Sequence, residues 1–326
     1  MKIGKIEINK GVFLAPMEGI TDLPFRLMCR RLGADIVYSE FIASEALVRN
    51  VEKSKLKMQI SEEERPVAVQ IFGNRREALV ESAKMVEDLG VDILDINFGC
   101  WVKKVVNNDS GAAFLKNPER MAEVTRYVVD AVSIPVTAKT RLGWDKNSIV
   151  IVELASMLEQ AGAAALTVHC RTRDMALRGD ADWSWIPKIK ANLKSMPLIL
   201  NGDVRTPSDA KKAFDTTNCD AIMIGRAAVG NPFIFKSIKT FLETGFDIEE
   251  SSVESRIDTC LEHLEMNIKY KGFPRGFLEF RKHYSGYLKG FHNGANIRRQ
   301  LVEMELLDDV VFKLEKYRQY LLDYQK

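Results

Sequence analysis

Eight short apolar runs recur between residues 11 and 226, and most of them lead through a polar or glycine-bearing tip into an amphipathic segment. Parallel strands covered on both faces lose the alternation of apolar and polar residues, so such runs are typical of a parallel sheet wrapped by helices. The pattern predicts a (β/α)8 TIM barrel, with a doubly wound open sheet as the alternative. The runs are GVFLAPM (11–17), ADIVYSE (34–40), PVAVQIF (66–72), VDILDIN (91–97), IPVTAKT (134–140), AALTVHC (164–170), PLILNGD (197–203) and AIMIGR (221–226).

The connections between the runs carry their own signals. TPSDAKKAF begins with Thr206 as a helix N-cap, Pro207 in the first helical position and Asp209 two positions later, which together predict a helix start. The stretch 99–117 shows no clear helical period, and we expect a long loop there. From about residue 236 the strand signals end and helical periods fill the chain, so we expect a barrel domain at 1–238 and an all-helical domain at 239–326.

Composition narrows the classes of function. The 47 basic and 45 acidic residues leave a net charge of only +2, so any affinity for a polyanion must come from a local patch. Five widely spaced cysteines without a C-x-x-C pair argue against a disulfide framework or a structural zinc site. The chain has no apolar run near the length of a membrane span and no secretory signal at its start. We expect a cytoplasmic protein without a metal.

Polar residues stand at nearly every expected strand end, which is where barrels place their active sites. The residues at these ends are Met17, Glu40, Gln70, Asn97 with Cys100, Lys139, His169, Asn201 to Asp203, and Gly225 with Arg226. A polar tip taken alone is as well explained by contact with water. The NGD and GR sequences on the seventh and eighth runs favour a phosphate-bearing ligand, because small residues, backbone N–H groups and an arginine meet there.

Two residues leave several chemical roles open. Lys139 suits the anionic ring of a reduced flavin, and it equally suits a Schiff base. Cys100 follows a buried strand directly, and the residues alone allow a packed thiol, a metal ligand, a nucleophile or a proton donor. The metal role lacks a second ligand nearby. A thiol with a pKa of about 8.5 is protonated at neutral pH without special tuning, which suits an acid.

With these residues in view, the chain resembles the tRNA-dihydrouridine synthases, and it is most similar to the bacterial class B members. The resemblance covers nearly the whole chain, and its motifs occur in order. They are LAPMEGITDLPFR (14–26), VQIFG (69–73), DINFGC (95–100) followed by KKV (103–105), AKTRLGW (138–144), LTVHCRTR (166–173), NGDVRTP (201–207) and IGRAAVGNPFIF (224–235).

The resemblance implies reduction of a uridine in tRNA to 5,6-dihydrouridine. NADPH reduces FMN, flavin N5 passes hydride to C6 of the base, and Cys100 protonates C5. It implies that the flavin is held by Ala15, Pro16, Met17, Gln70, Lys139 and His169, and its phosphate end by Asn201, Gly202, Asp203, Gly225 and Arg226. It also implies that Asn97 faces the target base and that Arg141 meets the RNA. Lys103 follows the cysteine in the same motif, and we expect it at the RNA as well.

The sequence departs from the family pattern at two positions. Trp101 stands where the family usually has proline after the cysteine, so the shape of the loop differs from the one that proline fixes. Trp101 either stacks on RNA or covers the loop. Cys170 stands where relatives often have glycine, and we expect a small buried thiol.

The C-terminal segment between Ile268 and Arg299 has eight basic residues against Glu279 alone, an excess of +7. We expect Lys282, Arg298 and Arg299 to neutralise tRNA phosphates. Six aromatic residues in this segment lie at three- and four-residue spacing, so we expect most of them to be buried. They are Phe273, Phe277, Phe280, Tyr284, Tyr287 and Phe291.

Two rival functions remain at this stage. A flavin reductase for a small molecule would use the same barrel and would not need the basic segment. An RNA-binding protein without turnover would keep the basic segment, and Trp101 beside the cysteine favours it.

Overall fold

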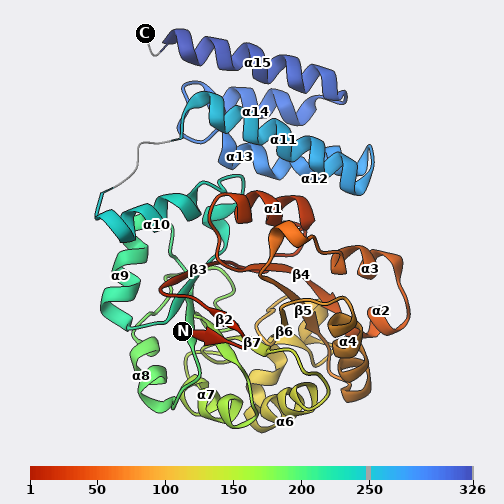
Figure 1. Cartoon of the computed structure of the whole chain (residues 1–326), viewed down its shortest axis with the longest axis vertical. Helices are drawn as coiled ribbons and strands as arrows, with labels where there is room; N and C mark the ends of the chain where they lie inside the picture. The colour runs from red at the N-terminus through yellow and green to blue at the C-terminus, as the bar shows by residue number, and fades with distance from the viewer. Residues whose placement is uncertain (247–250, 325–326) are drawn as a thin grey trace.

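The computed structural model describes residues 1–246 and 251–324. Eight parallel strands form a barrel, with hydrogen-bonded neighbours in the order β3-β10-β9-β8-β7-β6-β5-β4 (Figure 1). The ring closes where the Leu14 N–H donates to the Ile36 carbonyl at 3.0 Å and the Asp35 N–H donates to the Val12 carbonyl at 2.9 Å. The strands are β3 (Gly11–Leu14), β4 (Val37–Ala43), β5 (Val67–Phe72), β6 (Ile93–Asn97), β7 (Val136–Arg141), β8 (Ala165–His169), β9 (Leu198–Asn201) and β10 (Ala221–Ile224).

Each of the eight apolar runs contains or overlaps one of these strands, so the predicted (β/α)8 barrel is confirmed and the open doubly wound sheet is wrong. Alternate strand residues point in opposite directions. Phe13, Tyr38, Ile93, Ile199 and Met223 pack together as the barrel interior. The hairpin of β1 (Lys2–Ile3) and β2 (Ile6–Glu7) precedes β3, and its buried Ile3 joins the interior cluster. The N-terminal end of the barrel is therefore filled.

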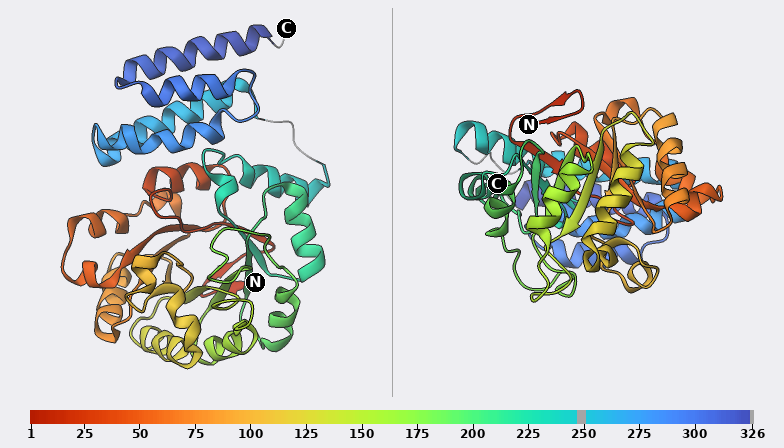
Figure 2. Two further views of the ribbon diagram at one scale, coloured as in Figure 1. Left: turned by 180° about the vertical axis from the view of Figure 1, so that it is seen from behind. Right: turned by 90° about the horizontal axis from the view of Figure 1, so that it is seen from below.

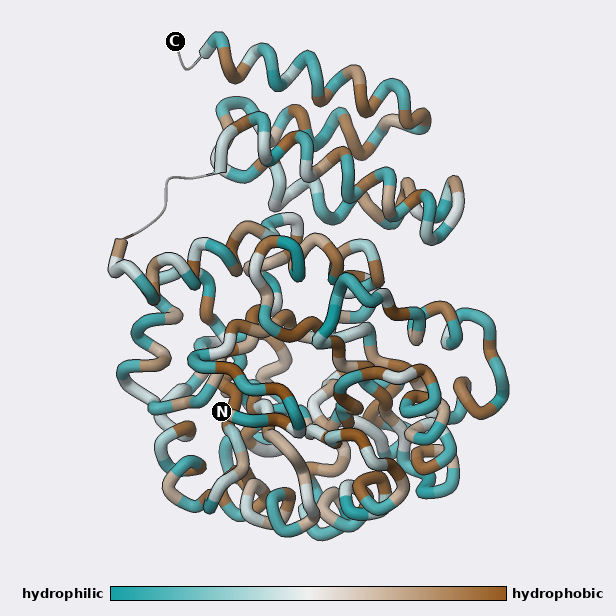
Figure 3. The backbone as a smooth tube through the Cα atoms, viewed as in Figure 1, coloured by the Kyte–Doolittle hydropathy of each residue, from teal (hydrophilic) through white to brown (hydrophobic). Residues whose placement is uncertain are grey.

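The other strand face packs against the surrounding helices. These are α1 (Leu23–Arg31), α2 (Ser44–Val48), α3 (Glu52–Met58), α4 (Arg76–Asp88), α5 (Lys103–Val106), α6 (Pro118–Val129), α7 (Ile151–Gln160), α8 (Trp185–Asn192), α9 (Pro207–Thr217) and α10 (Ile234–Thr244). Short 3-10 turns lie at η1 (Glu62–Glu64), η2 (Gly111–Lys116) and η3 (Arg226–Ala228). Along the outer helices apolar and polar residues alternate as amphipathic packing requires (Figure 3).

Two local predictions have different outcomes. The helix start at 206 is confirmed, because Thr206 and Asp209 cap one another's backbone N–H groups and Pro207 opens α9. The predicted long loop at 99–117 is partly wrong, because α5 and η2 lie within it. Val105, Val106 and Phe114 bury their side chains there, so tertiary packing stabilises two turns whose helical period is too short to detect.

The C-terminal helices stack beside the barrel as a separate layered unit (Figures 1 and 2). They are α11 (Val253–Lys271), α12 (Arg275–Phe280), α13 (Tyr284–Tyr287), α14 (Gly294–Glu303) and α15 (Leu307–Tyr324), with the turn η4 (Arg281–His283). The expected boundary after residue 238 falls inside α10, whose Phe235 and Ile238 pack in the barrel core. We propose that the helical domain begins after α10. Among the described residues, no helix is both long and apolar enough to traverse a bilayer.

Candidate active site

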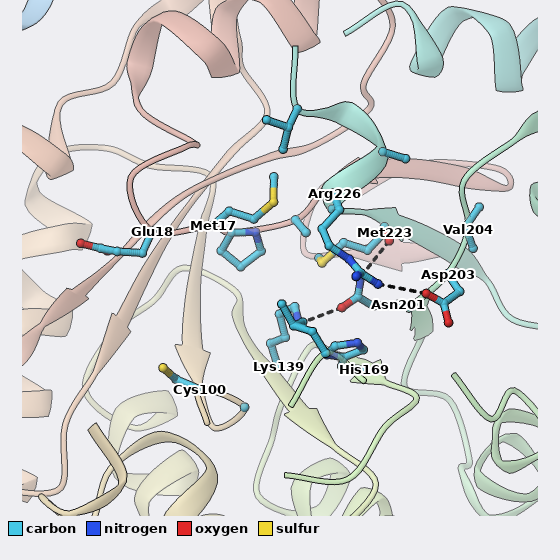
Figure 4. A pocket seen from close by; sticks show the side chains of 18 of the residues that line it. Met17, Glu18, Cys100, Lys139, His169, Asn201, Asp203, Val204, Met223 and Arg226 are labelled. Carbon is cyan, nitrogen blue, oxygen red and sulfur yellow. Dashed lines mark hydrogen bonds and ion pairs between the residues drawn. The ribbon is translucent and has the colours of Figure 1, made fainter. Parts of the chain in front are cut away.

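A cavity of about 760 Å³ opens at the carboxyl ends of the barrel strands (Figure 4). Ten of the eleven residues expected to bind the cofactor line it, and so do Asn97, Cys100 and Arg141. Ser285, Gly286 and Lys289 of the helical domain line the same cavity, which sequence reasoning missed because the packing of the two units is set by tertiary structure. The exception is Gln70, which is fully buried and lies outside the cavity lining.

Cys100 lies in a turn that hydrogen bonds hold on both sides. The Asn97 Oδ1 accepts from the backbone N–H groups of Gly99 and Cys100, at 3.0 and 2.9 Å. The Nε of Arg141 donates to the Gly99 carbonyl at 2.8 Å. The Cys100 carbonyl accepts from the Ala112 N–H at 3.0 Å, which ties the turn to η2. The thiol is thereby fixed at the cavity wall.

Burial raises the pKa of the Cys100 thiol above its usual value, while the Val102 N–H and the Arg141 cation oppose the shift. The thiol therefore carries its proton at neutral pH. All five cysteines lie in the described ranges, and Cys29, Cys170, Cys219 and Cys260 are buried whereas Cys100 is partly exposed. Cys170 is thus the small buried thiol that we expected. No cluster of metal-ligating side chains occurs within residues 1–246 and 251–324.

Lys139 and His169 project from β7 and β8 toward the same space (Figure 4). The Nζ of Lys139 donates to Asn201 Oδ1 at 3.0 Å, and burial together with the nearby Arg141 lowers the pKa of Lys139 to about 8. Burial, with the charges of Arg141 and Lys139, holds the pKa of His169 well below its usual value, so the ring is neutral. Arg171 can only donate toward His169 Nε2, 3.2 Å away, which places the ring hydrogen on Nδ1.

Asp203 gathers three guanidinium groups at the other end of the cavity. Its carboxylate pairs with Arg171, with Arg205 at 2.8 Å and with Arg226 at 3.1 Å. Burial opposes ionisation, but the Ala181 N–H and these arginines keep the pKa of Asp203 below its usual value. Three cations around one anion leave net positive charge beside Gly202 and Gly225, which suits an anionic group.

Two charged residues of the site were missed from the sequence. Arg171 is fully buried and connects His169 to Asp203. Asp95 is fully buried in β6 and accepts from Gln70 and Thr137, and burial raises its pKa to about 6. A carboxylate inside the apolar run VDILDIN was a usable signal, because a buried charge requires partners.

Trp101 differs from the other three tryptophans. Trp183 donates to the Gly202 carbonyl at 2.8 Å, and cations stack on Trp144 and Trp185. Trp101 is 36% exposed at the rim of the cavity, and it has no hydrogen-bond or ring-stacking partner among the residues that the structure describes. Both roles predicted for Trp101, stacking on RNA and covering the loop, stay predictions.

The residues expected to meet RNA are distributed over both units. Arg141 is buried in the cavity wall, and Lys103 is exposed at the start of α5. Lys282 is half-buried and donates to the Gly19 carbonyl of the barrel, so its ammonium already has a protein partner. Arg298 and Arg299 lie on α14, and the exposed side chain of Arg299 donates to Asn296 Oδ1 at 3.0 Å.

Ion pairs neutralise part of the positive charge that the sequence places in the helical domain. Lys271 pairs with Asp22 and Glu279, and Arg275 pairs with Glu279. Four of the six expected aromatic residues are buried, whereas Phe291 is partly buried and Phe273 is 57% exposed. The four buried rings are those of Phe277, Phe280, Tyr284 and Tyr287. Most of the aromatic stripe therefore forms the core of the helical domain.

A family model described as Dihydrouridine synthase (Dus) matches residues 13–323. A probable tRNA-dihydrouridine synthase of Rickettsia bellii is 40% identical over 91% of this chain and 91% of its own length. The tRNA-dihydrouridine synthase B proteins of Xanthomonas axonopodis pv. citri and Pseudomonas aeruginosa are each 40% identical, and each alignment covers 94% of this chain and 92% of the relative.

Solved structures show the same barrel at low sequence identity. A 2-naphthoyl-CoA reductase complex has a TM-score of 0.57 at 12% identity, covering 74% of this chain and 51% of that one. Histamine dehydrogenase from Rhizobium sp. 4-9 has a TM-score of 0.53 at 13% identity, covering 82% and 50%. The chain spans about half the length of each. At such identities the likeness concerns the fold alone.

Proposed function

Because this chain belongs to the dihydrouridine synthase family, we propose that it reduces a specific uridine in tRNA to 5,6-dihydrouridine, with bound FMN as cofactor and NADPH as reductant. The names of the relatives support tRNA as the substrate. The observation that carries the chemistry is a protonated, partly exposed thiol facing the same cavity as a partly buried lysine and a cluster of arginines.

The residues at the cavity fit a phosphate-bearing flavin. Its volume of about 760 Å³ lies within the usual range of roughly 300–1,000 Å³ for cofactor pockets. A Cβ at Gly225 would have only the Ala15 Cβ and the Met17 Sδ near it, each at 3.8 Å, so space opens beside this backbone. The neighbouring Arg226 side chain is half-exposed and turned toward Asp203, where an anion can meet it (Figure 4).

We assign the binding roles accordingly. Ala15, Pro16 and Met17 would hold the flavin ring, and the Lys139 ammonium would balance negative charge on it. Gly202, Gly225 and Arg226 would hold the phosphate, while Asp203 orients the arginines. We place His169 and Asn201 between the two ends, because Asn201 accepts from Lys139 of the ring end and Arg171 connects His169 to Asp203 of the phosphate end. When bound, the reduced flavin supplies the hydride that reaches C6 of the uridine.

Cys100 supplies the proton for C5, which completes the addition of two hydrogens across the C5–C6 double bond. Burial keeps the thiol protonated until the reaction, and the nearby Arg141 cation stabilises the thiolate that proton transfer leaves. Arg141 also holds the turn through the Gly99 carbonyl. The uridine must leave its stack to reach this wall of the cavity.

We propose that tRNA is bound by cations of both units. Lys103 and Arg141 flank the turn of Cys100, and Lys289 stands at the cavity rim from the helical side. Arg298 and Arg299 extend the basic surface along α14. Lys282 donates to the Gly19 carbonyl and thereby connects the helical domain to the barrel. Backbone charge and shape are sufficient for docking a structured RNA.

The test is anaerobic reoxidation of the NADPH-reduced protein with unmodified tRNA, followed by mapping of dihydrouridine in that RNA. Rapid reoxidation with dihydrouridine at a defined position is the expected result. A flavin that stays reduced with tRNA but is reoxidised by a small enone would contradict the proposal and favour a small-molecule reductase. Binding of tRNA without any dihydrouridine would instead favour an RNA-binding protein without turnover.

A further inference from the structure

Two buried amide side chains, those of Gln70 and Asn97, link the Asp95 carboxylate to the turn of Cys100 through successive hydrogen bonds. Gln70 Nε2 donates to Asp95 Oδ2 at 2.5 Å, and Asn97 Nδ2 donates to Gln70 Oε1 at 2.8 Å. Asn97 Oδ1 in turn accepts from the N–H groups of Gly99 and Cys100. Gln70 and Asp95 are fully buried and Asn97 is 8% exposed. We name Asp95, Gln70 and Asn97 the amide relay.

The polarity of the amide relay is set at one end. An ionised carboxylate only accepts hydrogen bonds, so Gln70 must turn its NH2 toward Asp95 and its oxygen toward Asn97. Asn97 must then turn its NH2 toward Gln70, which leaves its oxygen for the backbone of the turn. The opposite orientation of Asn97 would set its NH2 against two backbone N–H groups and leave buried donors unpaired.

Several groups face the Asp95 carboxylate and hold it ionised at neutral pH. Thr137 Oγ1 donates to Asp95 Oδ1, Gln70 donates to Asp95 Oδ2, and the Lys139 cation lies close enough to attract the charge. The neutral hydroxyl of Tyr38 also faces Asp95, and the nearby carboxylate contributes to its raised pKa. Burial raises the pKa of Asp95, and with these groups opposing the shift the pKa is about 6, so the carboxylate is ionised at pH 7 and above.

We propose that Asp95 is a positioning residue, which fixes the orientation of the Gln70 and Asn97 amides and thereby holds Cys100 at its place in the cavity wall. The role in catalysis rests on the proposed function of Cys100 as the proton donor. The positioning itself does not, because the thiol can be probed without tRNA. Cys100 is the only partly exposed cysteine, so an alkylating reagent reports on it selectively.

The first measurement is the rate of carboxamidomethylation of Cys100 by iodoacetamide at pH 8, followed by mass spectrometry. In Asp95→Asn the side chain can present either an oxygen or an NH2 to Gln70, so the polarity is no longer dictated. We expect Cys100 to react faster by roughly tenfold, the equivalent of one lost hydrogen bond in the turn. An unchanged alkylation rate in Asp95→Asn would overturn the proposal.

The decisive variant is the double exchange Asp95→Asn with Gln70→Glu. The carboxylate of the new glutamate would accept from the asparagine NH2 at 95 and from Asn97 Nδ2, so the orientation of Asn97 is again dictated. The asparagine oxygen would still accept from Thr137. We expect the alkylation rate to return toward that of the wild type. A double variant that reacts as fast as Asp95→Asn would contradict the proposal that Asp95 fixes the orientation of the two amides.

A matched control removes a different hydrogen bond from the same carboxylate. Thr137→Val leaves the amide relay intact, and at pH 8 the carboxylate stays ionised, so Cys100 should react at the wild-type rate. A rate increase as large as that of Asp95→Asn would show that loss of any contact loosens the region, which contradicts a specific relay.

The rates of the two half-reactions, reduction by NADPH and reoxidation by tRNA, test whether the position of Cys100 matters for catalysis. Asp95→Asn should slow reoxidation by tRNA by roughly 10- to 100-fold, as small misplacements of a reacting group do, and should leave reduction by NADPH unchanged. Equal slowing of both steps would count against a positioning role. If the wild-type protein makes no dihydrouridine, the proposed function fails, while the alkylation rates still decide whether the relay positions the thiol.

Discussion

The thiol of Cys100 is protonated although cations stand near it, because burial outweighs their attraction for the thiolate. A nucleophilic cysteine would need the reverse balance, with a pKa below neutrality. Arg141 lies at the same turn and also serves its geometry, so one residue both places the thiol and moderates its acidity. These opposing effects suit a group that must hold a proton and then release it.

Cys100→Ala is expected to slow tRNA-dependent reoxidation by roughly 10²- to 10⁴-fold, because general acid catalysis contributes about that much. Reduction by NADPH and the amount of bound flavin should not change, since the thiol serves only the second half-reaction. Stopped-flow absorbance of the flavin measures both steps. Cys170→Ala is the matched control, because this thiol is buried and faces no substrate. Unchanged reoxidation in Cys100→Ala would remove the thiol from the mechanism.

Lys139 predicts a pH dependence of flavin binding. Burial and the nearby Arg141 lower its pKa to about 8, so the ammonium is present below pH 8 and lost above it. The affinity of the apoprotein for FMN should therefore fall as the pH rises through about 8, because an attractive charge disappears. Arg141, with a pKa lowered by burial to about 10, stays charged over this range.

Fluorescence titration of FMN into the apoprotein between pH 6.5 and 9.5 measures this dependence. Lys139→Met should bind FMN weakly with an affinity that does not change between pH 7 and 9. A wild-type affinity that stays constant across pH 8 would contradict the role of the ammonium.

At this scale the sequence predicted the residues that stand at strand tips. Ten of the eleven residues predicted to bind the cofactor line the cavity, because barrel geometry places the strand ends together whatever the loops do. Asp95 and Arg171 were missed, since their importance depends on partners that are distant in sequence, namely Gln70 and Thr137 for Asp95 and Asp203 for Arg171. The family resemblance implied that Gln70 contacts the flavin ring. In the structure the Gln70 side chain instead accepts a hydrogen bond from Asn97 and lies outside the cavity lining.

At the scale of elements, the loop after β10 and helix α13 approach one another backbone to backbone. A Cβ at Gly286 would lie closer than 3.0 Å to the Val229 carbonyl and to Gly230, a separation that real Cβ atoms do not adopt. A Cβ at Gly230 would likewise meet the His283 carbonyl. This loop carries Gly225 and Arg226, so the contact between the two glycines positions the end of the cavity where we propose that the phosphate binds.

Gly286→Ala should therefore lower the free energy of unfolding by about 1–3 kcal/mol through overpacking and should weaken FMN binding as well. Gly290→Ala is the matched control. Gly290 has φ +84° with nothing within 4 Å, so alanine there costs only about 1–2 kcal/mol of backbone strain and should leave FMN affinity unchanged. Urea unfolding measures the two stability losses, and FMN titration distinguishes the two variants. Equal FMN affinity in both would contradict a positioning role for this contact.

Helix α14 predicts a salt dependence. Replacement of Arg298 and Arg299 by alanine should weaken tRNA binding and reduce the magnitude of the slope of log K against log salt by about 1–2, since each lost phosphate contact removes roughly 0.7–0.9. The control is Lys188→Ala, a cation of α8 stacked on Trp185 and outside the cavity lining. Filter binding from 50 to 300 mM salt measures the slope. A slope equal to that of the wild type would place the docking surface elsewhere.

The strands were predictable because each buried parallel strand requires its own apolar run. Short helices were not, because α5, α12 and α13 have four to six residues and depend on packing more than on periodicity. Phe273 fits the apolar period of the segment 273–291, yet it precedes α12 and stays exposed. Periodicity therefore predicts which residues share a helical face only where the helix continues through them.

At the scale of the whole molecule, buried contacts join the two units. Lys271 pairs with Asp22 at 2.5 Å, with side chains 4% and 1% exposed. The Phe25 ring packs against the rings of His263 and His283 at centroid distances of 5.4 and 4.9 Å. Tyr270 donates to the Leu56 carbonyl at 2.5 Å. The sequence separated two units but gave no sign of this interface, because its partners lie more than 200 residues apart.

The Lys271–Asp22 pair also supports the cavity. Asp22 Oδ1 caps α1 by accepting from the Phe25 N–H at 3.1 Å, and α1 follows the segment that carries Met17. In the same segment the Gly19 N–H donates to Glu40 at 2.7 Å, and the Gly19 carbonyl accepts from Lys282. The helical domain therefore holds the segment 17–22, whose Met17 and Glu18 line the cavity, through two lysines.

Lys271→Met should lower the free energy of unfolding by about 3–5 kcal/mol, because it leaves the Asp22 carboxylate buried without its cation. Arg275→Met is the matched control, since its pair with Glu279 is exposed and worth only about 0–1 kcal/mol. Adding Asp22→Asn to Lys271→Met should recover stability, because asparagine removes the unpaired charge and still caps α1. Guanidinium unfolding measures all four proteins. Equal losses in Lys271→Met and Arg275→Met, or no recovery in the double variant, would show that the buried pair does not join the two units.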